Sequence, residues 1–457
     1  MRLLSLACAL ALGLSSIAAP AATPAAASPA TDVPGSEAIV SKTLANGLKI
    51  IVWPDHDIPN ANFYTFYKVG SRNEYPGITG LAHYFEHMMF NGTTRRAPGA
   101  FDREMEAAGG SNNASTSNDL TIYTDWFPSS ALETIFDLEG DRMANLAFDP
   151  KVVESERGVV YSERRSSVDN DNFGTLLEQM QATAFTAHPY QFPTIGWPSD
   201  IEHWKLDDLK KFFKTYYAPN NAVLVIAGDV DAAQVFALAD KYLAPLQKQP
   251  EPTPITTVEP EQLGERRLVV ERSDAQSPIV AYAFHSGMGA GDKRLPALEL
   301  LTTILSQGQS SRLHQRLVER EQAATQAGAF AEAGFDPGLL WVYAMLPPGG
   351  DMARVESLLD DELAKIARDG VSADELAKAR NMKASAFWRG MATINGKARA
   401  LGTYEVFNGD YRKLFDAPSA YDAVSAADVQ ALAKRILRIQ NRTTGLLKPV
   451  AAKEAAK

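Results

Sequence analysis

A proline-rich segment divides this 457-residue chain into two halves of similar length. Residues 246–265 carry four prolines in a polar background and show no hydrophobic periodicity. Such a composition is typical of a linker between domains, and a single core built across it is disfavoured. The chain length also agrees with two or three domains, at roughly 150 residues for each. We therefore expect one domain over residues 38–245 and a second over residues 266–450.

The two halves repeat the same order of local patterns. In the first half, the strand-like GLKIIVWPD and NANFYTFYKVG precede the helical LAHYFEHMMF; in the second, ERRLVVERSD and SPIVAYAFHSG precede LPALELLTTILS. Alternating apolar residues favour half-buried strands, and apolar residues at i, i+3 and i+4 favour helices. These patterns predict the α+β class, with two homologous domains that each form a mostly antiparallel sheet with helices packed on one side.

The N-terminus has the pattern of a secretory signal peptide. Arg2 precedes an apolar run from Leu3 to Leu14, and small residues that suit cleavage follow. The run is too short for a permanent membrane span, and no other stretch of the sequence is long enough. We expect a signal peptide over residues 1–27, in preference to a retained anchor, then a flexible leader over 28–37 and a short tail over 451–457. The protein would then be periplasmic or secreted.

Composition narrows the classes of ligand and partner. The only cysteine, Cys8, lies in the expected signal peptide, so a disulfide framework and a Cys-rich metal site are both excluded. Any metal must be held by histidines and carboxylates. The formal net charge is 45 − 55 = −10, which argues against nucleic acid as a partner because phosphate binding needs a basic surface.

The sequence His83-Tyr84-Phe85-Glu86-His87 carries the chemistry. In a helix, His83 and His87 lie one turn apart on the same face, with Glu86 beside them. Two imidazoles at this spacing suit zinc, and a third protein ligand leaves the fourth position open for water. Zinc lowers the pKa of such a water towards about 7, so that a nearby carboxylate can take its proton. Glu86 is placed for that role.

The third ligand should be a carboxylate from another helix. Residues 154–164 read ESERGVVYSER, where Glu156 and Glu163 lie two helical turns apart and share a face. A charge run of this kind is usually a solvated helix face. A histidine pair that lacks a carboxylate ligand favours a role in metal binding instead, but spacing alone does not choose between the two glutamates.

The stretch GLAHYFEHMMFNGT resembles the active-site helix of the inverted-motif (H-x-x-E-H) zinc peptidases, the family of pitrilysin, insulin-degrading enzyme and mitochondrial processing peptidase. The chain length is similar to that of the short-chain bacterial branch. The resemblance implies half of a clamshell with one Zn²⁺ per chain. It also implies His83, His87 and Glu163 as ligands, since Glu163 follows His87 by 76 residues, and Glu156 as an additional acidic residue that supports activity.

The segment GGSNNASTSNDLTIY, residues 109–123, resembles the edge strand to which this family adds its substrate as a further β-strand. Asn113 and Ala114 fall on the Asn-Ala pair of that strand, which implies that they bind substrate. Strand addition supplies backbone hydrogen bonds with little sequence preference, which suits a peptide substrate. The alternative for Asn113 is an ordinary turn residue.

The second half departs from the family pattern. It has no H-x-x-E-H, as expected of a degenerate copy, but it also lacks an Arg and a Tyr that the family commonly places seven residues apart near SSRL. Val318 and Thr325 occupy those positions here. A developing oxyanion needs a donor opposite the metal. We therefore expect a heterodimer, in which a homologous partner subunit supplies the Arg/Tyr pair.

These features predict a zinc-dependent metalloendopeptidase that hydrolyses peptides or unfolded segments, with Glu86 as general base and then general acid. One alternative is a non-catalytic structural or assembly subunit of a peptidase-like complex. Another is a peptide-binding module with a structural zinc, which is disfavoured because structural zinc sites carry four protein ligands.

Overall fold

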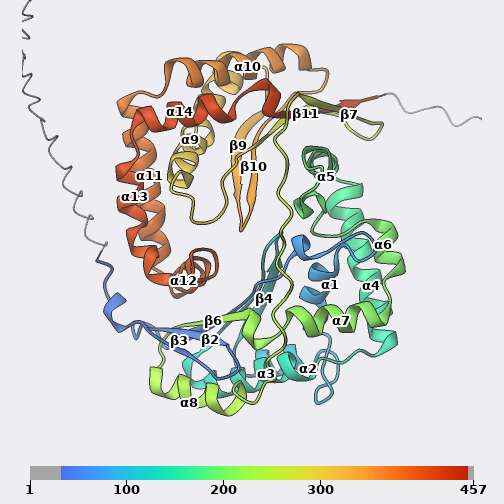
Figure 1. Ribbon diagram of the computed structural model, residues 1–457, viewed down its shortest axis with the longest axis vertical. Helices are drawn as coiled ribbons and strands as arrows, with labels where there is room; N and C mark the ends of the chain where they lie inside the picture. Colours follow the sequence, from blue (N-terminus) through green and yellow to red (C-terminus); the bar gives the residue numbers. More distant parts are fainter. Residues whose placement is uncertain (1–31, 451–457) are drawn as a thin grey trace, which may run out of the picture.

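The computed structural model describes residues 32–450, so the expected signal peptide and the C-terminal tail lie outside the described residues. The two halves of the chain lie one above the other, the first at the bottom of Figure 1 and the second at the top. Each half contains one β-sheet. None of the helices within residues 32–450 is long and apolar enough to cross a membrane.

The sheet of the first half has six strands in the order β1-β2-β6-β3-β5-β4. Only the neighbours β2 and β6 run parallel, and the other neighbours are antiparallel. The strands are β1 Val40–Thr43, β2 Lys49–Pro54, β3 Asn60–Tyr67, β4 Ser111–Thr116, β5 Thr121–Pro128 and β6 Ala222–Gly228.

The sheet of the second half has five strands in the order β7-β11-β8-β10-β9, in which only β7 and β11 run parallel. The strands are β7 Arg266–Arg272, β8 Ile279–His285, β9 Gln326–Ala333, β10 Pro337–Met345 and β11 Arg442–Pro449. When β7, β8, β9, β10 and β11 are matched to β2, β3, β4, β5 and β6, the strand order and the single parallel pair are the same. The prediction of two homologous α+β domains is confirmed.

Most helices of each half lie on one face of the sheet in the same half. The first half has α1 Leu81–Met88, α2 Ala100–Ala107, α3 Leu132–Asn145, α4 Pro150–Arg164, α5 Asn172–Ala184, α6 Pro198–His203, α7 Leu206–Tyr216 and α8 Ala232–Tyr242. The second has α9 Leu295–Ser306, α10 Met352–Asp369, α11 Ala373–Met391, α12 Ile394–Asn408, α13 Ala417–Ala423 and α14 Ala426–Ile436. One large apolar core per half lies between these layers.

The opposite face of each sheet is covered by a helix from the other half. Helix α12 packs on β3 and β6 of the first sheet, and α5 packs on β8 and β11 of the second. The fit is close in both places: a Cβ atom on Gly402 of α12 would lie 2.1 Å from the ring of Phe66, and one on Gly445 of β11 would lie 2.3 Å from the sulfur of Met180 in α5. This exchange of helices locks the two halves together.

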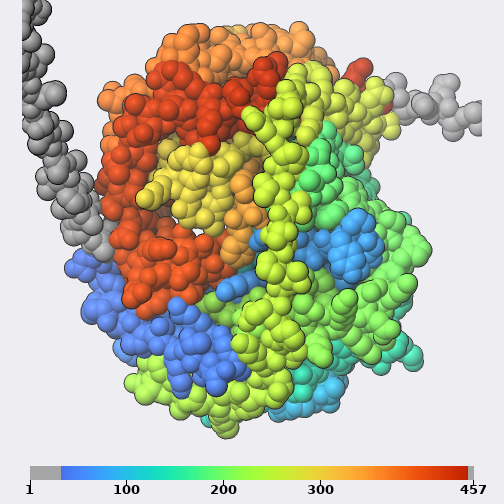
Figure 2. Space-filling model, in the orientation of Figure 1, coloured from blue at the N-terminus to red at the C-terminus, as the bar shows by residue number. Residues whose placement is uncertain are grey.

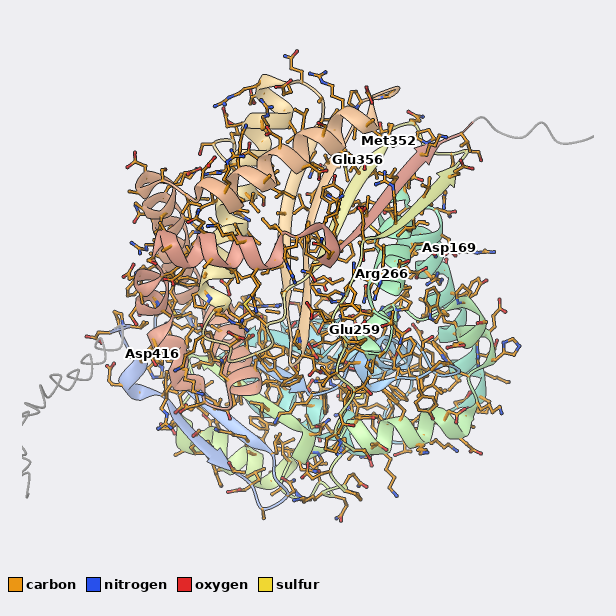
Figure 3. The ribbon with its side chains drawn as sticks, turned by 45° about the horizontal axis from the view of Figure 1, so that its top comes forward. Asp169, Glu259, Arg266, Met352, Glu356 and Asp416 are labelled. Atoms are coloured by element: carbon orange, nitrogen blue, oxygen red, sulfur yellow. The ribbon has the colours of Figure 1, made fainter. Side chains whose placement is uncertain are left out.

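The segment between α8 and β7 contains no helix or strand and runs as a strap across the face seen in Figure 2. The carboxylate of Glu259 fixes it by accepting hydrogen bonds from the backbone N–H groups of Thr186, Ala187 and His188 at 2.8, 2.9 and 2.9 Å. Arg266, at the start of β7, donates to carbonyl groups at the end of α5. Figure 3 labels Glu259 and Arg266, which lie between the two halves.

Candidate metal centre

Helix α1 carries the His83–His87 motif and is anchored by its apolar residues. Leu81, Tyr84, Phe85 and Met88 are fully buried, at the i, i+3, i+4 and i+7 spacing of one helix face. Two buried tyrosines also donate to its carbonyl groups: Tyr217 to Ala82 at 3.1 Å and Tyr123 to Phe85 at 2.8 Å. The orientation of the histidine-bearing face is therefore fixed from several sides.

The N-terminus of α1 is capped from a distance. Its N-cap residue is Gly80, with φ 88°, which offers no side chain for the first amides. Instead, the buried carboxylate of Glu74 accepts from the N–H groups of Gly80 and Ala82, both at 2.7 Å. Burial raises the pKa of Glu74, and the two amide hydrogen bonds oppose that rise. Glu74 thus takes the place of an N-cap side chain for the helix that bears the motif.

Helix α4 lies against α1 and carries both candidate glutamates. Asp149 caps its N-terminus by accepting from the N–H groups of Lys151 and Val152 at 2.8 and 3.2 Å, and Pro150 occupies the first turn. The hydroxyl group of Tyr84 in α1 donates to the carbonyl of Val153 at 2.9 Å, which joins the two helices directly.

Three side chains converge between the two helices. One ligand atom each of His83, His87 and Glu163 lies within 4.8 Å of the others. The Oε2 atom of Glu163 is 3.5 Å from Nε2 of His83 and 3.2 Å from Nε2 of His87. The hydrogen bond with His83 lowers the pKa of Glu163, although partial burial opposes this. Two imidazoles and one ionised carboxylate form the donor set of a catalytic zinc site.

Glu156 lies outside this group of three and contacts the other ring nitrogen of His87, Nδ1. Its Oε1 atom is 2.8 Å from Nδ1 of His87, and its Oε2 atom accepts from the side-chain amide of Asn91 at 2.7 Å. A carboxylate can only accept, so Nδ1 carries a proton directed at Glu156, and Nε2 is the ring nitrogen on the side of Glu163 that a metal would bind. Burial lowers the pKa of His87, but the hydrogen bond and charge of Glu156 outweigh it, and the pKa is raised. The residues therefore suit a zinc ion held by His83, His87 and Glu163.

Glu86 lies one residue before His87 and is partly buried. Within residues 32–450, no hydrogen bond joins its side chain to another residue. Its negative charge acts on His87 and helps to raise the pKa of that imidazole.

Comparisons with known proteins identify the family of this chain. The profile described as "Insulinase (Peptidase family M16)" matches residues 55–196, and that described as "Peptidase M16 inactive domain" matches residues 203–383. The zinc protease PqqE of Helicobacter pylori is 32% identical over 416 residues, which cover 90% of this chain and 92% of that protein. The chain belongs to peptidase family M16.

Solved M16 structures have the same fold. A crystal structure of a protease from Helicobacter pylori has a TM-score of 0.87 at 30% identity, covering 90% of this chain and 99% of that one. A structure described as a peptidase M16 inactive domain from Pseudomonas fluorescens has a TM-score of 0.83 at 18% identity, covering 92% and 100%. The predicted resemblance to the inverted-motif zinc peptidases is therefore confirmed.

The candidate substrate strand of this M16 chain is an edge strand. Within the described residues β4 pairs only with β5, so its other side is unpaired, and α1 packs against it. Asn113 is exposed and Ala114 is partly buried. The N–H of Ala114 donates to the side-chain oxygen of Asn113 at 2.9 Å. The structure thus places both predicted substrate residues on an open edge next to the motif helix.

The second M16 half has no equivalent group of ligands. The third, sixth and seventh residues of α9 are Ala297, Leu300 and Leu301, all buried, where α1 has its two histidines and Glu86. Val318 lies in a short helical segment, His314–Arg320, and Thr325 directly precedes β9. The expected Arg and Tyr are absent from these two positions.

Two residues that support the site, Asn91 and Glu74, were not expected from the sequence. Asn91 is a helix-stop signal in sequence. It lies four residues after His87, just beyond the end of α1, and its amide reaches both the carbonyl of His87 and the carboxylate of Glu156. That spacing was the available signal. Glu74 carried no signal, because the amides it caps are six and eight residues away across a loop without periodicity.

Proposed function

We propose that this M16 protein is a zinc-dependent metalloendopeptidase that acts on peptides or unfolded segments in the periplasm or outside the cell. The observation that carries the proposal is the convergence of His83, His87 and Glu163 within 4.8 Å, with Glu86 in the residue before His87 and its charge acting on that imidazole. The location rests on the signal-peptide pattern of the N-terminus.

In the proposed mechanism, His83, His87 and Glu163 hold the zinc ion. When bound, the zinc supplies a Lewis acid that polarises a carbonyl group and lowers the pKa of water. Glu86 accepts the proton of the attacking water on its carboxylate and then donates it to the nitrogen of the leaving amine. Glu156 and Asn91 keep the His87 ring oriented throughout.

The substrate binds in an extended conformation along β4. Backbone groups on the unpaired edge, near Asn113 and Ala114, hydrogen bond to the peptide and place its scissile bond beside α1. This binding mode demands little of the substrate side chains, and it excludes segments that are already paired in a folded sheet.

The complete enzyme is proposed to be a heterodimer. With Val318 and Thr325 where the family has Arg and Tyr, this chain lacks a side-chain donor for the oxyanion at those positions. A second homologous subunit would supply it. The competing proposal, a non-catalytic subunit, is favoured by the same two residues and by the match of residues 203–383 to the M16 inactive domain.

The test is a peptidase assay of the zinc-loaded protein, alone and with the product of a neighbouring gene that encodes a similar chain. Glu86→Gln should lower kcat by about 10²- to 10⁴-fold, the usual contribution of a general base, with unchanged zinc binding. Glu154→Gln, an exposed change on α4, is the control. If the mixture of the two chains kept its turnover with Glu86→Gln, this chain would be a non-catalytic subunit. Full activity of the protein alone would contradict the heterodimer.

A further inference from the structure

A short turn before α1 contacts both the second half of the chain and the motif helix. The turn is η2, Ser71–Asn73. Backbone hydrogen bonds close it, from Asn73 N to Gly70 O at 3.0 Å and from Glu74 N to Ser71 O at 3.1 Å. Arg72 and Glu74, which are two residues apart, contact different neighbours from this one rigid turn.

Arg72 binds the loop between β9 and β10, which belongs to the second half. Its Nη2 atom lies 2.5 Å from Oδ2 of Asp336, and its guanidinium group lies over the ring of Phe335 at 5.1 Å from the centroid. Its Nη1 atom is also 3.4 Å from Oδ1 of Asp119, which follows β4. The Arg72 side chain is only 13% exposed, so these contacts are largely shielded from solvent.

The same loop is seated closely on the first half. The hydroxyl group of Tyr190 donates to Asp119 at 2.8 Å and accepts from the N–H of Asp336 at 3.1 Å. The N–H of Phe335 donates to Asp119 at 3.3 Å. A Cβ atom on Gly334 would lie 2.1 Å from Oδ2 of Asp119, so no larger residue fits there without a shift. The position of the loop is thus determined on several sides.

Glu74 transmits that position to α1. Its carboxylate binds the N–H groups of Gly80 and Ala82, and His83 follows directly. Because Gly80 has no side chain, Glu74 supplies the only side-chain cap of these amides within the described residues. A displacement of the η2 turn would move the first turn of α1, and with it His83.

We infer that Arg72 and Glu74 are positioning residues, through which the Gly334–Asp336 loop of the second half sets the first turn of α1 and hence His83 and Glu86. The second half, which has no metal-binding motif, then affects the metal centre by fixing the position of the turn that caps α1. The inference rests on the proposed function only for the identity of the metal, since the contacts themselves belong to the fold.

The test compares two Asp→Asn changes that each remove a carboxylate charge at a contact between the halves. Asp336→Asn removes the charge that faces Arg72 at 2.5 Å and Nε2 of His188 at 3.1 Å. Asp55→Asn breaks the 2.5 Å pair with Lys397 of α12, and within the described residues neither Asp55 nor Lys397 has a hydrogen bond or ion pair with η2. Zinc affinity is measured by chelator competition, and amide exchange of α1 is measured on the zinc-free protein.

Asp336→Asn should weaken zinc binding about three- to tenfold, less than the ten- to hundredfold typical of residues that touch a ligand directly. It should also speed exchange at the amides of Gly80 and Ala82. Asp55→Asn should leave both quantities unchanged, even if both variants unfold at a lower temperature. Gly334→Ala, which displaces the loop without removing a charge, should reproduce the effect of Asp336→Asn.

The double variant with Glu74→Gln tests whether the two residues act in series. If they do, the loss of zinc affinity in Asp336→Asn/Glu74→Gln is smaller than the sum of the two single losses on a free-energy scale. Additive losses, or identical behaviour of Asp336→Asn and Asp55→Asn, would overturn the inference. A wild-type protein that binds no zinc would instead overturn the proposed function, because the exchange measurement needs no metal.

Discussion

His87 and Glu156 are joined by a hydrogen bond of 2.8 Å between the imidazole Nδ1 and the carboxylate Oε1. The other oxygen of Glu156 binds Asn91 at 2.7 Å, so both oxygens are occupied and neither lies in the group of three converging ligand atoms. Glu163, two turns later on the same helix, contacts the opposite nitrogen of His87 at 3.2 Å. The two glutamates thus lie at different nitrogens of one ring, Glu156 at Nδ1 and Glu163 at Nε2.

This separation predicts that Glu156 acts on zinc affinity indirectly. Glu156→Gln should weaken zinc binding about ten- to hundredfold, because the ring and tautomer of His87 lose their orienting acceptor. Glu154→Gln is the matched control, since Glu154 is on the same helix, 72% exposed, and paired with Arg157. Chelator competition measures both variants, and equal affinities would contradict the role given to Glu156.

Metal removal should destabilise the wild-type protein. A ligand that binds only the folded state adds about 4 kcal/mol to the free energy of unfolding at a free concentration of 1,000 times its Kd. A strong chelator should therefore lower the unfolding temperature of the zinc-loaded protein by several degrees. Glu163→Gln lacks the carboxylate ligand and should show almost no chelator-dependent shift in calorimetry. A full shift in that variant would mean that zinc binds elsewhere.

In the proposed addition of the substrate to β4, the peptide hydrogen bonds to the backbone N–H of Ala114, which donates to the side chain of Asn113 in the structure. Ala114→Pro removes this donor from an edge strand, where proline is tolerated. KM should rise about fivefold, because one lost hydrogen bond costs about 1 kcal/mol, while zinc affinity stays unchanged. Ala114→Ser keeps the N–H and should keep the KM of the wild type.

Local patterns were sufficient to predict much of the fold. The alternation in GLKIIVWPD and the helical spacing in LAHYFEHMMF involve only residues that are close together in the sequence. The same holds for the placement of His83 and His87 one helical turn apart. The repetition of these patterns in both halves therefore predicted two homologous domains.

Features that depend on distant contacts could not be read from the sequence. The fit of Gly402 against Phe66 becomes visible only once α12 is placed on the sheet of the other half. Glu156 and Glu163 share one face of α4, and only the way α4 lies against α1 brings one of them to Nδ1 and the other to Nε2 of His87. Spacing alone could not make that distinction.

Asp119, which binds the Gly334–Asp336 loop of the second half, should make the free energy of unfolding depend on pH. Burial raises the pKa of Asp119 from 3.8 to about 6, and the charge of Asp336 adds to this, while Arg72, the hydroxyl of Tyr190 and the N–H of Phe335 oppose it. A carboxyl group with a raised pKa in the folded state favours folding when protonated. Its contribution is therefore fully present below about pH 4 and is lost as the pH rises to about 6.

Asp119→Asn removes this titration. The free energy of unfolding of the wild type, relative to the variant, should therefore fall by about 2 kcal/mol between pH 4 and pH 6.5, at 1.36 kcal/mol per unit of pKa. Urea denaturation at several pH values measures the difference. A difference that grows with pH would show that Arg72 outweighs burial.

The exchange of helices between the halves predicts opposite effects for two helical glycines. Gly402→Ala in α12 would place a methyl group 2.1 Å from the ring of Phe66, and such overpacking should cost about 1–3 kcal/mol of stability. Gly390→Ala in α11 meets no atom within 4 Å and should gain up to about 1 kcal/mol from helix propensity. Chemical denaturation of both variants measures the two signs. If Gly402→Ala were also stabilising, α12 could not be packed tightly on the first sheet, because the same methyl group can help its own helix only where the other half leaves it room.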